Sequence, residues 1–403
     1  MSSTVASGHG RAGDDLAADL VRRARELAPL LAERSAEAAE LRSLPVDVVD
    51  ALREAQLLSL GPPAALGGHD VDLDTMLDVA YEIGRGCASV GWCWQIWTLH
   101  SWFTGYLSEE GQAEVFARGA DTIISSGYNP GGAIAERAEG GWRLSGRWSF
   151  SSGVDHADWV LLGATLPGVE RTADALVSLL VVPRDDVQVQ DTWFVMGLKG
   201  TGSKSLAIDE PVFVPDHRVL DMDGAEHGPA IERYGRASYG MPPAMATGFV
   251  GAAPLVGAAR GALDEFCEQM QVSKDSLTAA SRASKATLQL RIGESAAEID
   301  AATWLARAGQ RELLELGARR ASLTPEQRAT IRLHQCYTAE LARRAITRLY
   351  DASGTATMAA TSPMWRRVSD VEAGMKHFTH RWDEYAESYG RVRLGLEANA
   401  ILR

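Results

Sequence analysis

The feature that most constrains the fold is a change of pattern in the middle of the chain. Between about residues 121 and 222, short runs rich in β-branched and aromatic residues, such as DWVLLGATL and ALVSLLVVP, alternate with Gly, Pro and Asp. Runs of this kind, separated by turn residues, indicate a small antiparallel β-domain or barrel. The segments on both sides have a helical pattern. Because the strands are confined to one block, the sequence predicts an α+β protein and not a doubly wound sheet.

The flanking segments carry the three- and four-residue spacing of amphipathic helices. Near the N-terminus, Leu20, Ala24, Leu27 and Leu31 share one face, with charges on the other. The stretch TPEQ (Thr324–Gln327) is a capping box that predicts the start of a long helix. We therefore divide the 403 residues into a disordered tail (1–13), an N-terminal helical domain (14–120), a β-barrel-like domain (121–222) and a C-terminal four-helix-bundle domain (235–403).

Charge and composition exclude several classes of partner. The net charge is −13 and the 40 basic residues are dispersed, so nucleic acid is not expected as a partner, since phosphate backbones need clustered Lys and Arg. No apolar run approaches the roughly 20 residues of a membrane helix, and the N-terminus lacks the apolar core of a signal peptide. The 4 cysteines form no CxxC pair, which favours reduced, buried thiols and a cytoplasmic location.

Several familiar sites are absent or weak. GLKGTGSKS (197–205) lacks the Gly-Lys-Ser/Thr of a P-loop, and neither G-x-G-x-x-G nor G-x-S-x-G occurs at a strand end. DVDLD (70–74) resembles the start of a calcium loop but lacks its glycine, so we interpret it as a helix cap. His377 and His380 lie one helical turn apart, with Glu384 beyond them, but no third strong ligand is adjacent. We predict no metal site.

Small polar residues gather at three places in the β-rich block. Ser125–Gly127 end the first β-run, Ser151–Gly153 end the run GRWSFSSG, and Thr201–Ser203 lie in a loop. These residues stand where a sheet would prefer Val or Ile. Together they suggest a surface of hydroxyls and backbone N–H groups that receives a planar polar ring or a phosphate chain. The alternative is that each is an ordinary turn.

Four stretches, together with the order of the zones, resemble the acyl-CoA dehydrogenase superfamily. They are VVDALREAQLLSLGPPAALGGHDVDLDTMLDVAYEIGRGCASVGW, GRWSFSSGVDHADW, MGLKGTGSKSLAIDEPVFVP and GAARGALDEF. The resemblance extends from about residue 16 to residue 395. SGVDHADW is most similar to the group D flavin-dependent monooxygenases, the branch of p-hydroxyphenylacetate, 3-hydroxy-seco-androstenedione and naphthocyclinone hydroxylases.

The resemblance implies a two-component reaction. A separate NAD(P)H flavin reductase would supply reduced FMN, with FAD possible in its place, and O2 would form a C4a-hydroperoxide that hydroxylates an aromatic substrate, phenolic or polyketide-like. It also implies an acyl-CoA-dehydrogenase-like fold and a homotetramer assembled through the C-terminal bundle.

Flavin contacts follow from the same resemblance. Ser152 would bond the flavin N5, and Ser126 would contact the flavin or the peroxide. Thr201, Ser203 and Trp148 are further expected flavin contacts. Arg260 resembles an arginine that family members place near the flavin, although an interhelical salt bridge is an equal alternative for it.

Two histidines are expected on the substrate side. His377 follows Asp370 where many family members have a catalytic Glu, and an imidazole suits proton exchange with a phenol; Ser369 stands where the family usually has Arg. His100 resembles the family's substrate-side histidine. The alternatives are a helix-surface residue for His377 and a core histidine bonded to a carbonyl for His100. The expected walls of a dry substrate pocket are aromatic: Trp94 and Trp97, with Trp92 and Trp102 nearby.

Other functions remain open at the level of sequence. The same fold serves FAD-dependent acyl-CoA dehydrogenases and N- or S-oxygenating enzymes, which differ in the residues of the cavity. A catalytically silent binding or scaffold protein is a further alternative from another class.

Overall fold

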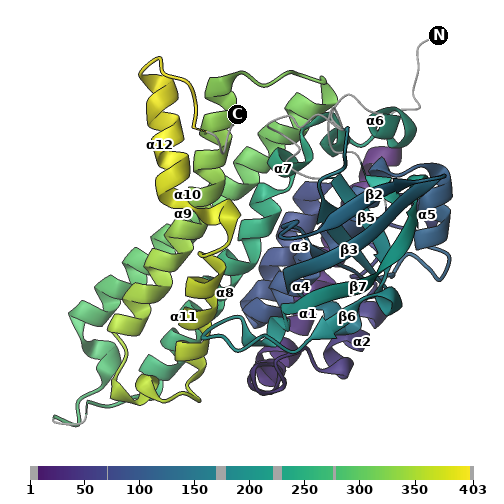
Figure 1. The fold of residues 1–403 in the computed structure, drawn as a ribbon. Coiled ribbons are helices and arrows are strands. Elements are labelled where there is room, and N and C mark those ends of the chain that lie inside the picture. The colour runs from purple at the N-terminus through teal and green to yellow at the C-terminus, as the bar shows by residue number, and fades with distance from the viewer. Residues whose placement is uncertain (1–7, 70, 169–177, 221–228, 276–277, 400–403) are drawn as a thin grey trace.

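The structure is a computed structural model and describes residues 8–69, 71–168, 178–220, 229–275 and 278–399. Helices come first, strands occupy the middle of the chain, and long helices complete it (Figure 1). This order confirms the predicted α+β class. The tail predicted over residues 1–13 falls partly outside the described residues, and helix α1 begins at Gly8.

The N-terminal helices are α1 (Gly8–Leu41), α2 (Val46–Glu54), α3 (Leu73–Gly86), α4 (Ala88–Phe103) and α5 (Glu109–Val115). Every residue of α4 except Ile96 is buried, because a helix that is apolar all round lies inside a core. The Asp72 carboxylate accepts a hydrogen bond from the Leu73 N–H at the start of α3. DVDLD is therefore a helix cap, as predicted, although Asp70 lies outside the described residues.

The middle of the chain forms two four-stranded sheets. The strands are β1 (Ile124–Gly127), β2 (Ile134–Ala138), β3 (Gly141–Ser151), β4 (Trp159–Ala164), β5 (Ser178–Pro183), β6 (Gln188–Gln190), β7 (Lys204–Pro215) and β8 (Val219–Leu220). One sheet has the order β1-β4-β5-β8 and the other β2-β3-β7-β6. The pairing of β1 with β4 is parallel, whereas the other described pairs are antiparallel. Leu144, Val160 and Leu206 belong to the apolar core that both sheets enclose.

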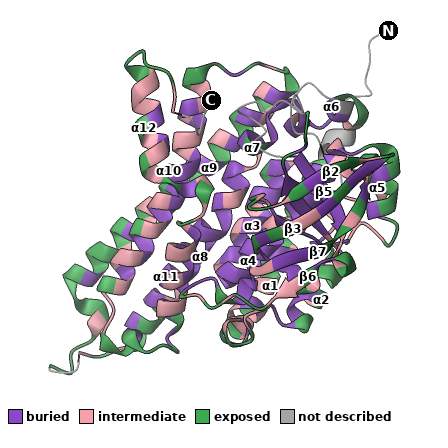
Figure 2. Cartoon of the chain, viewed as in Figure 1, coloured by how far each residue is buried: buried purple, intermediate pink, exposed green. Residues whose placement is uncertain are grey.

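The C-terminal helices are α6 (Pro229–Tyr234), α7 (Pro243–Ala246), α8 (Gly248–Val272), α9 (Ala286–Ala318), α10 (Pro325–Asp351), α11 (Pro363–Gly374) and α12 (Trp382–Arg393). The capping box predicted at Thr324 is present at the start of α10. Helix α8 is largely buried between the neighbouring helices (Figure 2). It crosses α3 so closely that a Cβ on Gly257 would lie 2.0 Å from Tyr81 O. Glycine at this crossing lets the bundle pack directly on the N-terminal helices.

Some structural features are absent from the part of the chain that the structure describes. Cys87, Cys93, Cys267 and Cys336 are all free thiols there. No described helix has both the length and the hydropathy needed to cross a bilayer. Over the same residues, no three His, Cys, Asp or Glu side chains come together in a way that would hold a metal ion.

Candidate active site

The three polar clusters of the β-rich block meet in space. Ser125 Oγ lies 2.8 Å from Ser151 Oγ and donates to Ser152 O at 2.8 Å. Ser152 Oγ lies 2.8 Å from Ser203 Oγ, which is 2.7 Å from Thr201 Oγ1. We call the three hydroxyls of Ser152, Ser203 and Thr201 the hydroxyl chain. All three side chains are buried, so the ends of β1 and β3 and the start of β7 form one polar face.

Gly153 allows the end of β3 to approach helix α4. Its φ is +68°, a left-handed conformation that favours glycine, and its N–H donates to Thr201 O at 2.7 Å. A Cβ at this position would lie 2.4 Å from the Trp97 ring. Glycine is therefore required at position 153, because a larger residue would clash with the buried Trp97 ring, which is 2% exposed.

Trp148 and Phe150, two residues apart on β3, have opposite environments. Trp148 is 2% exposed, lies in the core between the sheets and donates its indole N–H to Gly163 O at 2.8 Å. Phe150 has a φ of +68° and a side chain that is 71% exposed, with its ring edge toward Trp193. The sequence predicted Trp148 as a flavin contact, but Phe150 is the ring of this strand that is open to a ligand. The cause is an irregularity of the β3–β7 register between Trp148 and Ser151, which breaks the alternation of side chains.

His100 lies on α4 against the end of β1. Its Nδ1 is 3.0 Å from Ile124 O, and because a carbonyl only accepts, Nδ1 carries the proton and Nε2 keeps a lone pair. Burial lowers the pKa of His100 to about 4. The structure therefore contains the carbonyl-bonded core histidine of the alternative interpretation. The same geometry also makes His100 a neutral acceptor.

His377 and His380 follow α11 and meet a tryptophan of α4. The His377 and Trp92 rings contact edge to face at a centroid distance of 5.3 Å, and His380 and Trp92 at 6.3 Å. His377 Nδ1 is 2.7 Å from Thr379 Oγ1, and His380 Nδ1 is 3.1 Å from Gly374 O. Burial lowers the pKa of His377 to about 3 and that of His380 to about 4. Helix α11 ends at Gly374, so His377 lies in the connection to α12 and not on a helix surface.

Asp370, on α11, contacts the loop that leads to Thr201 and Ser203 of the hydroxyl chain. Its buried carboxylate accepts a hydrogen bond from the Leu198 N–H at 2.6 Å. On the same loop, a Cβ at Gly197 would lie 1.8 Å from Ser369 O. Burial raises the pKa of Asp370 to about 6. The loop with Gly197 and Leu198 and helix α11 are thus packed against each other.

The remaining predicted residues lie elsewhere. Arg260, on α8, bonds the Tyr81 hydroxyl at 3.2 Å and forms an ion pair with Asp300 of α9, which is the interhelical alternative. Trp94 is fully buried and donates its indole N–H to Leu57 O at 2.7 Å. Ser126 follows Ser125 on β1 and is 8% exposed. Of the aromatic residues of α4, Trp92 is the one that contacts both histidines, and sequence spacing did not distinguish it.

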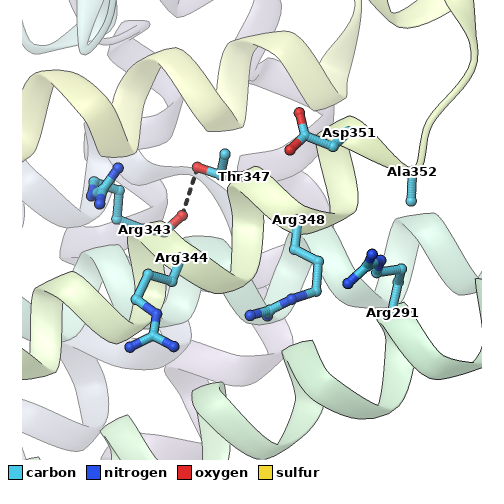
Figure 3. Close-up of a pocket in the computed structure, with 7 residues that line it drawn as sticks. All are labelled: Arg291, Arg343, Arg344, Thr347, Arg348, Asp351 and Ala352. Carbon is cyan, nitrogen blue, oxygen red and sulfur yellow. Dashed lines mark hydrogen bonds between the residues drawn. The ribbon is translucent and has the colours of Figure 1, made fainter.

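A separate hollow lies between α9 and α10 (Figure 3). It has a volume of about 450 Å³ and is lined by Arg291, Arg343, Arg344, Thr347, Arg348, Asp351 and Ala352. Its guanidinium groups are paired with carboxylates: Arg291 with Glu294, Arg343 with Glu340, and Arg344 and Arg348 with Glu298. Because these charges are neutralised within the bundle, we assign no anion to this hollow.

Comparison with known proteins identifies the family. Residues 249–382 match the family model described as acyl-CoA dehydrogenase, C-terminal domain. The chain is 32% identical over 392 residues to the oxygenase component of an FADH(2)-dependent resorcinol hydroxylase from Rhizobium sp. (strain MTP-10005), covering 94% of each protein. The chain belongs to the flavin-dependent monooxygenases of the acyl-CoA dehydrogenase fold. The resemblance inferred from the sequence is thereby confirmed.

Two solved structures have the same fold as this chain. The crystal structure of 3-HSA hydroxylase from Rhodococcus sp. RHA1 matches with a TM-score of 0.86 at 28% identity, over 95% of this chain and 99% of that one. XiaF from Streptomyces sp., in complex with FADH2 and glycerol, matches with a TM-score of 0.85 at 25% identity, over 98% and 99% of the two chains. The predicted acyl-CoA-dehydrogenase-like architecture is confirmed.

Proposed function

We propose that this flavin-dependent monooxygenase is the oxygenase component of a two-component system and hydroxylates a phenolic aromatic substrate with reduced flavin and O2. The observation that carries the proposal is the end of β3. There an outward-facing aromatic ring, Phe150, lies two residues from the buried hydroxyl of Ser152. An aromatic face next to fixed polar groups suits a flat ring with polar edges.

The residues at this face fit a flavin. Phe150 provides the ring for stacking, and Ser152 and Ser126 provide hydroxyls toward the edge of the isoalloxazine. Thr201 and Ser203 hold Ser152 in place through the hydroxyl chain. A bound reduced flavin supplies the electrons that activate O2. Arg260 lies in its own ion pair with Asp300, so we leave it out of the flavin site.

Two neutral imidazoles act on the substrate side. His100 holds its proton on Nδ1 through Ile124 O, which leaves Nε2 to accept the hydrogen of a phenol. His377, against Trp92, is the second group that exchanges a proton with the substrate. A phenol that shares its hydrogen becomes more electron-rich at the ring carbons, which favours attack by an electrophilic oxygen. The buried wall formed by Trp97 and the rest of α4 keeps water away from this reaction.

A homotetramer built through the C-terminal bundle is part of the proposal. On the outer face of α9, apolar and small residues are exposed at three- and four-residue steps: Leu290, Gly293, Ala297, Ala301, Trp304 and Ala308. We call this set the α9 stripe. Trp304 is 78% exposed and Leu290 is 65% exposed. This spacing suits helix-on-helix packing, and large exposed apolar side chains in a row indicate an interface. We propose a second copy of this chain as the partner.

The deciding experiment is oxygen consumption by the purified protein. With a panel of phenols, O2 uptake and product hydroxylation are measured after adding FMNH2, FADH2 or neither, with a flavin reductase and NAD(P)H as the source. We expect hydroxylated product only with reduced flavin, and the comparison of FMNH2 with FADH2 identifies the cosubstrate. Retention of a yellow oxidised FAD, together with dye reduction by acyl thioesters, would overturn the proposal in favour of a dehydrogenase.

A further inference from the structure

The hydroxyl chain has a fixed direction. Thr201 Oγ1 lies 2.8 Å from Leu198 O, and because a carbonyl only accepts, the single proton of Thr201 points there. Thr201 must therefore accept from Ser203, which lies 2.7 Å away. With its proton directed to Thr201, Ser203 can only accept from Ser152, at 2.8 Å. Each hydroxyl thus donates toward Leu198, and the proton of Ser152 points away from the open end of the chain.

The acceptor that sets this direction is held firmly. Leu198 has a φ of +52°, and its N–H donates to the buried Asp370 carboxylate at 2.6 Å. Leu198 O also accepts the Trp193 indole N–H at 3.1 Å. The hydroxyl chain itself is nearly inaccessible, with Thr201 1%, Ser203 5% and Ser152 6% exposed. Because water has little access to these groups, it cannot easily take over as an alternative acceptor and reverse the chain.

We propose that Thr201 and Ser203 make the flavin site selective for the reduced cofactor, by leaving Ser152 with a lone pair and no proton to offer. The inference rests on the proposed function, which places a flavin next to Ser152. Reduced flavin carries a hydrogen on N5 and is a donor there, whereas N5 of oxidised flavin is an acceptor. Ser152 accepts a hydrogen bond from N5–H of reduced flavin. With oxidised flavin, Ser152 and N5 are two buried acceptors that face each other, and both are left unsatisfied.

This selectivity suits an enzyme whose flavin arrives from another protein. The cosubstrate must bind in the reduced form and leave in the oxidised form. A hydroxyl that accepts from N5–H stabilises the incoming reduced flavin. After the reaction the same hydroxyl opposes the oxidised flavin and favours its release. Thr201 and Ser203 are thus specificity-determining residues that act through Ser152.

The test compares equilibrium binding of oxidised and reduced FMN. Ser203→Ala frees the proton of Ser152, and Thr201→Val frees that of Ser203, so in both variants Ser152 can turn a proton toward N5. Dissociation constants are measured by fluorescence titration, aerobically for FMN and anaerobically for FMNH2. We expect the ratio of the constants, oxidised over reduced, to fall about tenfold in both variants, the equivalent of one hydrogen bond. Thr201→Ser keeps the hydroxyl and should keep the wild-type ratio. Ser295→Ala, which removes a buried hydroxyl from α9, should also keep it.

The outcomes separate this inference from the proposed function. An unchanged ratio in folded Ser203→Ala and Thr201→Val overturns the inference, as does an equal weakening of both forms, which would indicate a structural role only. If the wild type binds neither form of flavin, the proposed function fails instead. A fall of the ratio in both variants, with Thr201→Ser unchanged, supports the fixed direction of the chain.

Discussion

The backbone φ angle of Phe150 determines the direction of its aromatic ring at the end of β3. An aromatic residue at a φ of +68° is unusual, and such conformations persist where the surrounding structure imposes them, commonly at functional sites. The conformation turns Phe150 outward, while Trp148 remains in the core. Phe150 is thus placed to stack on a ring without disturbing the packing of the sheets.

Replacing Phe150 tests this assignment. Phe150→Ala should weaken flavin binding about tenfold, because one aromatic stacking face is lost, whereas thermal stability should hardly change for so exposed a side chain. Isothermal titration with reduced flavin measures the first effect and a melting curve the second. Phe213→Ala removes another exposed Phe, from β7, and should leave flavin binding intact. Wild-type affinity in Phe150→Ala would contradict the stacking role.

His380 is a buried neutral base, and its pKa makes stability depend on pH. Burial lowers the pKa in the folded state to about 4, while the unfolded value stays near 6.5. The unfolded chain therefore binds a proton that the folded chain does not. The unfolding free energy is therefore highest above about pH 6.5, where His380 is neutral in both states, and it decreases as the pH falls toward 4.

We expect His380→Gln to reduce this pH dependence. Glutamine can still donate to Gly374 O but does not titrate. Relative to pH 7, the wild type should lose about 2 kcal/mol more unfolding free energy at pH 5 than the variant does. Urea unfolding at both pH values measures the difference. Parallel losses in the two proteins would show that His380 is not a buried neutral base.

At the scale of elements, sequence patterns predicted the kinds of segment but not how they meet. The β-rich block, the TPEQ cap and the three serine and threonine clusters follow from local residue types, and they are where the structure has them. The parallel pairing of β1 with β4 and the irregularity in β3 depend on long-range contacts. The sequence therefore did not indicate that Trp148 would be buried and Phe150 exposed. His377 and His380 contact Trp92 from the segment that follows the end of α11 at Gly374. The spacing of residues along the sequence does not predict this contact between distant segments.

The contact of α11 with the loop that carries Leu198 has a testable consequence. Asp370→Ala leaves the Leu198 N–H buried without an acceptor, which should cost about 1–3 kcal/mol of stability. Asp370→Asn retains an acceptor oxygen and should recover most of that loss. Chemical denaturation measures both variants, and flavin affinity should fall together with stability only in Asp370→Ala. Equal destabilisation by Ala and Asn would mean that the negative charge, and not the hydrogen bond to Leu198, matters.

At the scale of the whole molecule, one surface is left uncovered by the fold. The α9 stripe runs along the bundle on the side of α9 that faces away from the core, with Trp304 78% exposed. An apolar row of this kind is costly on an isolated chain in water. A second copy that packs α9 against α9 would cover both rows at once, because the same patch is self-complementary about a two-fold axis.

Trp304→Glu should therefore break the assembly. A carboxylate buried against an apolar partner helix lacks compensation, so the dissociation constant of the oligomer should rise about a hundredfold or more. Size-exclusion chromatography with light scattering, at several concentrations, measures the mass. Phe213→Glu introduces the same charge at another exposed aromatic position, on β7, and should leave the mass unchanged. If Trp304→Glu keeps the wild-type mass at all concentrations, the α9 stripe is not the interface.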